Sequence, residues 1–104
     1  MAAIRFVGVR DLSPEERLLL DELAARYHPK IERALRNEVD LVVHVKTHKA
    51  PPGKEGGKKF SVHVHVNAPT KAIKSSKADS WELGTALRQA FEEVERQAQH
   101  TFKD

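Results

Sequence analysis

Three histidines in two valine-rich segments are the residues of this chain best placed to do chemistry. His63 and His65 lie in residues 60–66, where apolar and polar residues alternate, so a strand there puts both imidazoles on one side. His44 lies in the similar segment 39–46 and would supply a third ring from a neighbouring strand. Three histidines form one of the known ligand sets of catalytic zinc, so a zinc site is one hypothesis for this face.

Two features of the sequence argue against a metal at these histidines, and we expect none. No carboxylate is placed to hold the imidazole rings in a ligating orientation, and a surface rich in lysine repels a divalent cation. Two interpretations remain for the three rings. They contact RNA, where imidazoles can stack on bases, or they are simply tolerated on an exposed sheet face.

Positive charge is concentrated in the middle of the chain. The protein has a net charge of +3, but residues 44–77 hold eight lysines and one acid, Glu55. This segment therefore carries +7 and the rest of the chain −4. Such polarity favours a polyanionic partner, with a solvated lysine-rich surface as the alternative.

Other routes to catalysis lack their residues. There is no cysteine for a nucleophile or a thiolate metal site. The glycines of residues 53–58 lack the spacing of a phosphate-binding loop, and no serine follows the pattern of a strand-to-helix nucleophile. Trp81 and Phe91 have the spacing of core residues. We expect no enzymatic activity, no cofactor and no small-molecule substrate.

The first half of the chain predicts a strand, a helix and a strand. A short strand over 4–7 ends near Gly8, and Ser13 followed by Pro14 is typical of a helix start. Apolar residues then recur at helical spacing to Leu35. Pro29 lies inside this pattern and is expected to kink the helix or divide it near Tyr27 and His28.

The second half predicts two strands, a weaker strand and a helix. The strands over 39–46 and 60–66 are joined by a long, basic and mobile hairpin loop over 49–59. A lysine-rich edge strand follows over 71–77. The last helix is expected to begin at Asp79 or Ser80, with Asp79 and Glu82 resembling a capping box.

The resulting order, β-α-β-β-β-α, predicts an α+β fold in one domain over residues 1–104. Each strand has one apolar side, so a four-stranded sheet should carry both helices on one face and leave the other to water or a partner. The apolar runs are far shorter than the roughly 20 residues of a membrane span, and the N-terminus lacks a signal pattern. We expect a cytoplasmic protein without membrane contact.

In order and spacing, five short motifs resemble the short ribosome hibernation-promoting factors, the family that includes ribosome-associated inhibitor A. They are Gly8, the helix start at 12–14, the Lys-Ile-Glu-Arg run at 30–33, the acidic-then-aromatic segment 78–81 and the Val-Glu-Arg-Gln run at 94–97. Pro29 and the length of the 49–59 loop depart from the family pattern. The chain also ends near the last helix, so we expect it to lack the domain through which long members pair ribosomes.

The resemblance implies a protein that binds small-subunit ribosomal RNA in the channel for messenger and transfer RNA, blocks translation and protects idle ribosomes under stress. Lys30, Arg33 and Arg96 match family positions that are basic near the RNA. The complete set of expected RNA contacts is Lys30, Arg33, Lys46, Lys49, Lys71, Lys74, Lys77, Arg88, Arg96, His44, His63 and His65. We expect a monomer that gathers these groups on one surface. Binding to structured or double-stranded RNA in general is the alternative function.

Overall fold

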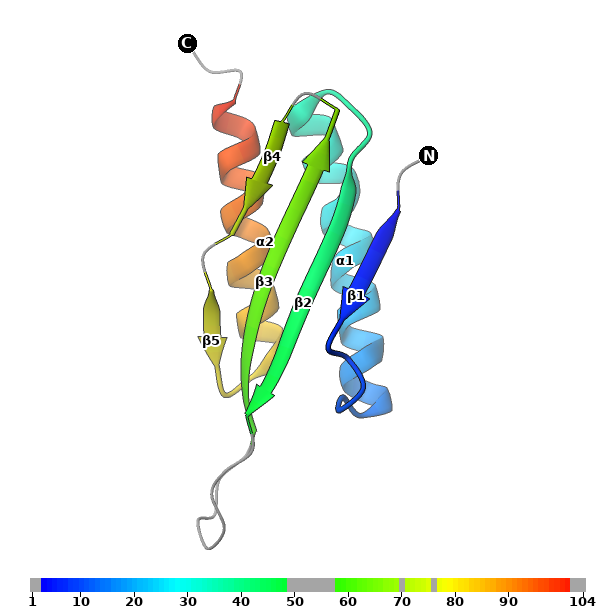
Figure 1. The fold of residues 1–104 in the computed structure, drawn as a ribbon, viewed down its shortest axis with the longest axis vertical. Coiled ribbons are helices and arrows are strands. Elements are labelled where there is room, and N and C mark those ends of the chain that lie inside the picture. Colours follow the sequence, from blue (N-terminus) through cyan, green and yellow to red (C-terminus); the bar gives the residue numbers. More distant parts are fainter. Residues whose placement is uncertain (1–2, 49–57, 70, 76, 102–104) are drawn as a thin grey trace, which may run out of the picture.

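The structure, a computed structural model, describes residues 3–48, 58–69, 71–75 and 77–101. Its elements are β1 (Ile4–Val7), α1 (Pro14–Leu35), β2 (Asp40–His48), β3 (Lys59–Ala68), β4 (Lys71–Lys74), β5 (Ala78–Ser80) and α2 (Leu83–His100). The α+β class and the arrangement of two helices on one sheet are as the sequence predicted (Figure 1). None of the described helices is long and apolar enough to cross a membrane.

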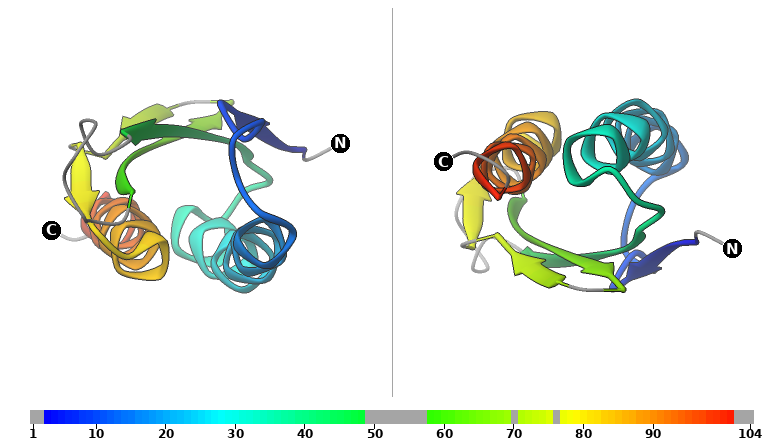
Figure 2. Two further views of the ribbon diagram at one scale, coloured as in Figure 1. Left: turned by 90° about the horizontal axis from the view of Figure 1, so that it is seen from below. Right: turned by 90° about the horizontal axis from the view of Figure 1, so that it is seen from above.

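The sheet has the strand order β1-β2-β3-β4, with β5 also paired to β3. β1 runs parallel to β2, and the other pairs are antiparallel. Viewed along the sheet, both helices lie on the same side of it (Figure 2). The opposite side of the sheet is covered by no described element, so its side chains are available to a partner.

The core lies between the sheet and the two helices. Alternation along β2 and β3 sends one side chain in two toward the helices, and each buried valine or leucine contributes roughly 1.5–3 kcal/mol. Tyr27 of α1 stacks on Phe91 of α2 with ring centroids 5.1 Å apart, which joins the helices. The largest fully buried side chains are Phe91, Leu20, Ile31, Leu41, Leu87, Val39, Val43, Val62, Val64, Val66 and Val94.

Helix α1 starts as its sequence predicts. The Ser13 hydroxyl accepts a hydrogen bond from the Glu16 backbone N–H at 3.1 Å, and the Glu16 carboxylate accepts one from the Ser13 N–H at 2.8 Å. This capping box satisfies two N–H groups that the first helical turn would leave unpaired.

The expected division of α1 at Pro29 is wrong, because the helix is continuous from Pro14 to Leu35. Pro29 cannot donate a hydrogen bond to the carbonyl of Ala25, four residues earlier. Both residues lie on the exposed side of the helix, where water can solvate the released carbonyl. The apolar side of the helix keeps its packing, and this outweighs the local cost of the proline.

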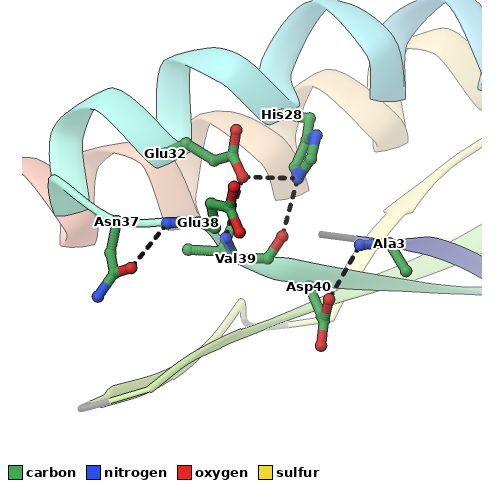
Figure 3. A network of polar contacts seen from close by, with 7 residues as sticks. All are labelled: Ala3, His28, Glu32, Asn37, Glu38, Val39 and Asp40. Carbon is green, nitrogen blue, oxygen red and sulfur yellow. Dashed lines mark hydrogen bonds and ion pairs between the residues drawn. The ribbon is translucent and has the colours of Figure 1, made fainter. Parts of the chain in front are cut away.

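A polar network joins the end of α1 to the start of β2 (Figure 3). The Val39 N–H donates to Glu32 Oε2 at 3.0 Å, and the Val39 carbonyl lies 2.8 Å from His28 Nε2. The same His28 nitrogen is 3.4 Å from Glu32 Oε2. Asp40 then accepts a hydrogen bond from the Ala3 N–H at 2.9 Å, which fixes the N-terminal strand beside β2.

Gly8 ends β1 where the chain passes very close to β2. Its φ is +80°, and a Cβ atom built there would lie 2.1 Å from the carbonyl oxygen of Val45. Only glycine accommodates both the left-handed backbone and this close approach.

The last strand and the start of the last helix differ from expectation. The edge strand predicted over 71–77 ends at Lys74 as β4, and a fifth strand, β5, forms where the last helix was expected to begin; both strands pair with β3. Asp79 belongs to β5 and caps no helix, because α2 begins at Leu83 with Glu82 as its N-cap residue. Trp81 precedes the helix and is 63% exposed, so the expectation that it packs in the core is wrong, whereas Phe91 is buried.

Between β4 and β5, a serine side chain replaces the missing strand partner. The Ser75 N–H donates to the Val64 carbonyl, and Ser75 Oγ accepts a hydrogen bond from the Val64 N–H, both at 2.9 Å. Buried backbone groups of β3 thus stay paired where the edge is interrupted. These hydrogen bonds also fix the position of Lys74 at the end of β4.

Candidate nucleic-acid interface

The side of the sheet away from the helices carries a continuous polar surface, here called the open face. Strand alternation and the pairing register place on it the residues Arg5, Val7, Asp40, Val42, His44, Lys46, His48, Lys59, Ser61, His63, His65, Asn67, Ala72, Lys74 and Asp79. In the central strands β2 and β3 the residues between them, such as Leu41, Val43, Val62 and Val64, point into the core, so the listed side chains lie on the opposite side of the sheet.

Cations outnumber acids on the open face. Arg5, Lys46, Lys59 and Lys74 come from four neighbouring strands, and the described residues there include two acids, Asp40 and Asp79. Asp40 accepts the hydrogen bond from the Ala3 backbone already described. Lys77 adds a further cation, since it lines a shallow hollow of the face together with His44, Lys46 and His63. This surface suits a polyanion.

Three histidines form a cluster at the centre of the open face. The ring centroids of His44 and His65 are 4.9 Å apart, and those of His63 and His65 are 6.3 Å apart. Partial burial lowers the pKa of His65 below its usual 6.5, and the neighbouring His44, Lys74 and His63 lower it further. His65 is therefore mostly neutral at neutral pH, and its protonation adds charge to a face that is already cationic.

The described residues offer no ligand set for a metal at this cluster. No group of three or more histidine, cysteine, aspartate or glutamate side chains in the described part of the chain is arranged to hold a metal ion. Lys74 also acts on His65 from the adjacent strand. The zinc hypothesis from the sequence therefore finds no support at His44, His63 and His65.

A serine, a histidine and an aspartate meet at the other end of the face, in an order that does not activate a nucleophile. The Ser61 hydroxyl donates to Asp79 Oδ1 at 2.5 Å, and His48 Nε2 lies 3.1 Å from the same hydroxyl oxygen. In a catalytic triad the histidine stands between serine and acid and accepts the serine proton. Here the acid accepts the hydrogen bond from Ser61 directly, and this bond is the main cause that lowers the pKa of Asp79. The arrangement is structural.

The remaining candidate cations lie on the other side of the molecule and are Lys30, Arg33, Arg88 and Arg96. Together with Glu92, Glu95 and Gln99 they form a region here called the helix surface. Lys30 and Arg33 of α1 line a hollow together with Glu95 and Gln99 of α2. The Lys30 ammonium lies 5.2 Å from the centroid of the Tyr27 ring, whose hydroxyl donates to Glu92 at 3.4 Å. Acids thus alternate with cations here.

The expectation that one surface gathers all the candidate residues is wrong. The structure brings together His44, His63, His65, Lys46 and Lys74, with Lys77 beside them, on the open face. It places Lys30, Arg33, Arg88 and Arg96 in the helical layer, on the opposite side of the sheet (Figure 2). Lys49 lies outside the described residues, and Lys71 is described by its backbone, which pairs with Ala68.

The sequence reasoning missed two cations of the open face, Arg5 and Lys59. Arg5 pairs in register with Val42, and Lys59 with His48. The signal that could have found them is the same alternation that identified the histidines, extended to the short first strand and by one residue before Phe60.

Comparisons with known proteins support the fold. No family model matches the sequence, and a search of curated proteins finds no match. A solved structure of a ribosomal subunit interface protein from Coxiella burnetii is similar with a TM-score of 0.64 at 20% sequence identity, over 94% of this chain and 93% of that chain. The N-terminal domain of Protein Y from Thermus thermophilus is similar with a TM-score of 0.62 at 18% identity, over 95% of this chain and 93% of that chain. At these identities the likeness establishes a shared fold.

Proposed function

We propose that this chain is a non-enzymatic factor that binds small-subunit ribosomal RNA in the channel for messenger and transfer RNA and so inhibits translation. The observation that carries the proposal is the uncovered, cationic open face, on a fold shared with a protein described as a ribosomal subunit interface protein. The resemblance of the sequence motifs to the hibernation-promoting factors supports the same role. The protein acts as a monomer in the cytoplasm, where ribosomes are found.

Charge provides the affinity in this mechanism, and shape provides the location. Arg5, Lys46 and Lys74 neutralise phosphates along the open face, and each neutralised phosphate releases counterions. Phosphate contacts also fix the orientation of a protein on folded RNA. The His44–His65 pair adds flat, polar rings that can lie against bases.

RNA lines more than one wall of such a channel. A protein bound inside it can therefore contact RNA through cations on two opposite surfaces. The open face then contacts one wall of the channel, and Lys30, Arg33 and Arg96 of the helix surface contact the other. Occupying the channel excludes messenger and transfer RNA, and no bond is made or broken. Inhibition is therefore steric and reversible.

Sedimentation with ribosomes through a gradient tests this function. At low salt the protein should migrate with small subunits, and at high salt it should remain at the top, because phosphate contacts weaken steeply with salt. Excess messenger RNA with transfer RNA should displace it, and a plain RNA duplex should not. Protein that stays at the top at low salt would overturn ribosome binding, and displacement by the duplex would instead favour general duplex binding.

A charge-reversal variant tests whether the helix surface takes part. Replacing Lys30, Arg33 and Arg96 by glutamate should abolish migration with small subunits while the circular dichroism spectrum stays unchanged. The matched control is Arg17→Glu, because Arg17 lies outside both surfaces, where it pairs with Asp21 at 3.4 Å. Unchanged migration of the triple variant would restrict the interface to the open face.

A further inference from the structure

An exposed tryptophan stands at one end of the open face. Trp81 follows β5 directly, and 63% of it is accessible to solvent, more than Leu18 at 59% or Val7 at 47% among the exposed large hydrophobic residues. Tryptophan usually buries most of its large apolar ring, so this exposure costs free energy unless a partner covers the ring.

A lysine lies beside this ring. The Lys59 ammonium lies 5.9 Å from the centroid of the indole. Lys59 also lines a hollow at the same end of the sheet, together with Lys77, His48, Ser61 and Asp79. The ring thus lies beside one lysine, with a second lysine in the adjoining hollow, which favours a ligand that combines a flat ring with negative charge over an apolar protein partner.

The acids near Trp81 are already engaged. Asp79 accepts the hydrogen bond from Ser61 at 2.5 Å. Glu82, the residue after Trp81, accepts a hydrogen bond from the Thr85 hydroxyl at 3.3 Å. These hydrogen bonds fix the orientation of the two carboxylates, and the negative charge of Asp79 offsets part of the charge of Lys59 and Lys77 in the hollow that the three residues share.

We propose that Trp81 is a stacking platform for one unpaired nucleotide of an RNA, with Lys59 and Lys77 neutralising the phosphates that flank it. Every base has a flat π-face, and stacking on an exposed aromatic side chain beside cations is the usual way proteins hold single-stranded RNA. In a duplex the bases are stacked on each other, so they cannot reach the ring. The inference rests on the proposed function and names the kind of RNA element, an unpaired base, that this end of the open face takes.

Fluorescence reports on this site directly, because Trp81 is the only tryptophan of the chain. Titration with a short unstructured oligoadenylate should quench the emission saturably, since a stacked base perturbs the indole. Inorganic polyphosphate, which offers charge without bases, should bind without comparable quenching. Oligoadenylate that binds without changing the emission, or polyphosphate that quenches equally, would overturn the proposal.

Substitutions separate stacking from simple contact. Trp81→Leu should weaken binding of labelled oligoadenylate, measured by anisotropy, by about five- to 150-fold, the range expected when one base stack is removed. Trp81→Phe should retain most of the affinity. The control is Leu18→Ala, which removes the other highly exposed apolar side chain and should change nothing. Equal affinities of the Trp81→Leu variant and the wild type would refute the platform.

The outcomes distinguish this inference from the proposed function. Trp81→Leu is expected to keep the melting temperature, because the ring contributes little to the core; if it fails to fold, Trp81→Phe and the fluorescence titration still decide. Migration with small subunits without quenching by oligoadenylate would leave the function standing and remove the platform. Quenching by oligoadenylate without migration would do the reverse.

Discussion

The open face and the helix surface carry similar numbers of cations and two acids each, but they differ in where the acids lie. On the strands, Asp40 and Asp79 lie toward opposite ends of the open face, so Lys46 and Lys74 are paired across the strands with Ser61 and His65. On the helices, residues three and four apart share a side, and Glu92 and Glu95 therefore lie among the arginines of α2. The position of the acids, more than the count of charges, thus distinguishes the two surfaces.

The largest effect on binding is expected at the open face. Replacing Lys46 and Lys74 by alanine should lower the slope of log affinity against log salt by about 2, one for each phosphate that is no longer neutralised. Filter binding to small subunits over a range of salt concentrations measures this slope. Arg17→Ala should leave it unchanged, and an unchanged slope in the lysine variant would remove the open face from the interface.

A smaller effect is expected at the helix surface. Lys30→Ala combined with Arg33→Ala should lower the same slope by about 1, because Glu95 in the same hollow already offsets part of their charge. Adding Glu95→Gln to the wild type should strengthen binding. If the helix pair lowers the slope more than the pair on the open face, our ranking of the two surfaces is wrong.

Ser75→Ala tests the strand edge that positions Lys74. The change leaves the buried N–H of Val64 without its acceptor, so the free energy of unfolding should fall by about 1–3 kcal/mol. RNA affinity should fall less than in the lysine variants, since the charge is retained. Urea denaturation gives the first quantity and filter binding the second. A Ser75→Thr variant, which keeps the hydroxyl, should recover much of the stability.

The smallest effect is expected from pH, and it has opposite signs for binding and for stability. Phosphates favour protonated His65, whose pKa in the free protein lies below 6.5, so affinity should rise as the pH falls through this region. The unfolded chain takes up that proton more readily than the folded one. Stability from this group is therefore present above pH 6.5 and lost as the pH falls toward the lowered pKa.

His65→Asn should reduce both pH dependences. Binding and thermal unfolding measured between about pH 5 and 7.5, around the ordinary histidine pKa, give the two trends. Affinity that is flat across this interval would show that the histidine cluster takes no part in RNA contact.

Much of the fold could be predicted from local patterns. The valine alternation in 39–45 and 62–66, the helix start at Ser13 and Pro14, and the apolar spacing of both helices each act within a few residues, and the structure confirms them. The expectations that Asp79 caps the last helix and that Trp81 packs in the core were wrong. Both came from patterns of neighbouring residues, whereas β5 exists through its pairing with β3. That pairing joins Phe60 to Ser80, and no short-range pattern encodes it.

The candidate site was predictable within each strand, and the expectation of a single surface was at odds with the predicted layers. Alternation alone assigned His44, His63, His65 and Lys46 to one side of their strands, because side chains on a strand repeat every two residues. The predicted packing of both helices on the apolar side of the sheet already implied that Lys30 and Arg33 lie behind that polar side. The expectation of one surface did not take this consequence into account.

The sequence by itself determined which side of each element is apolar, and hence that a polar, cationic side of the sheet would remain. Only the tertiary structure decided that β5 pairs with β3 and that Trp81 stands in solvent beside Lys59. The physical reason is the range of the interactions: hydrogen bonds and side-chain periodicity act between near neighbours in the chain. The packing of layers and the pairing of β5 join residues that are distant in sequence and meet only in the folded protein.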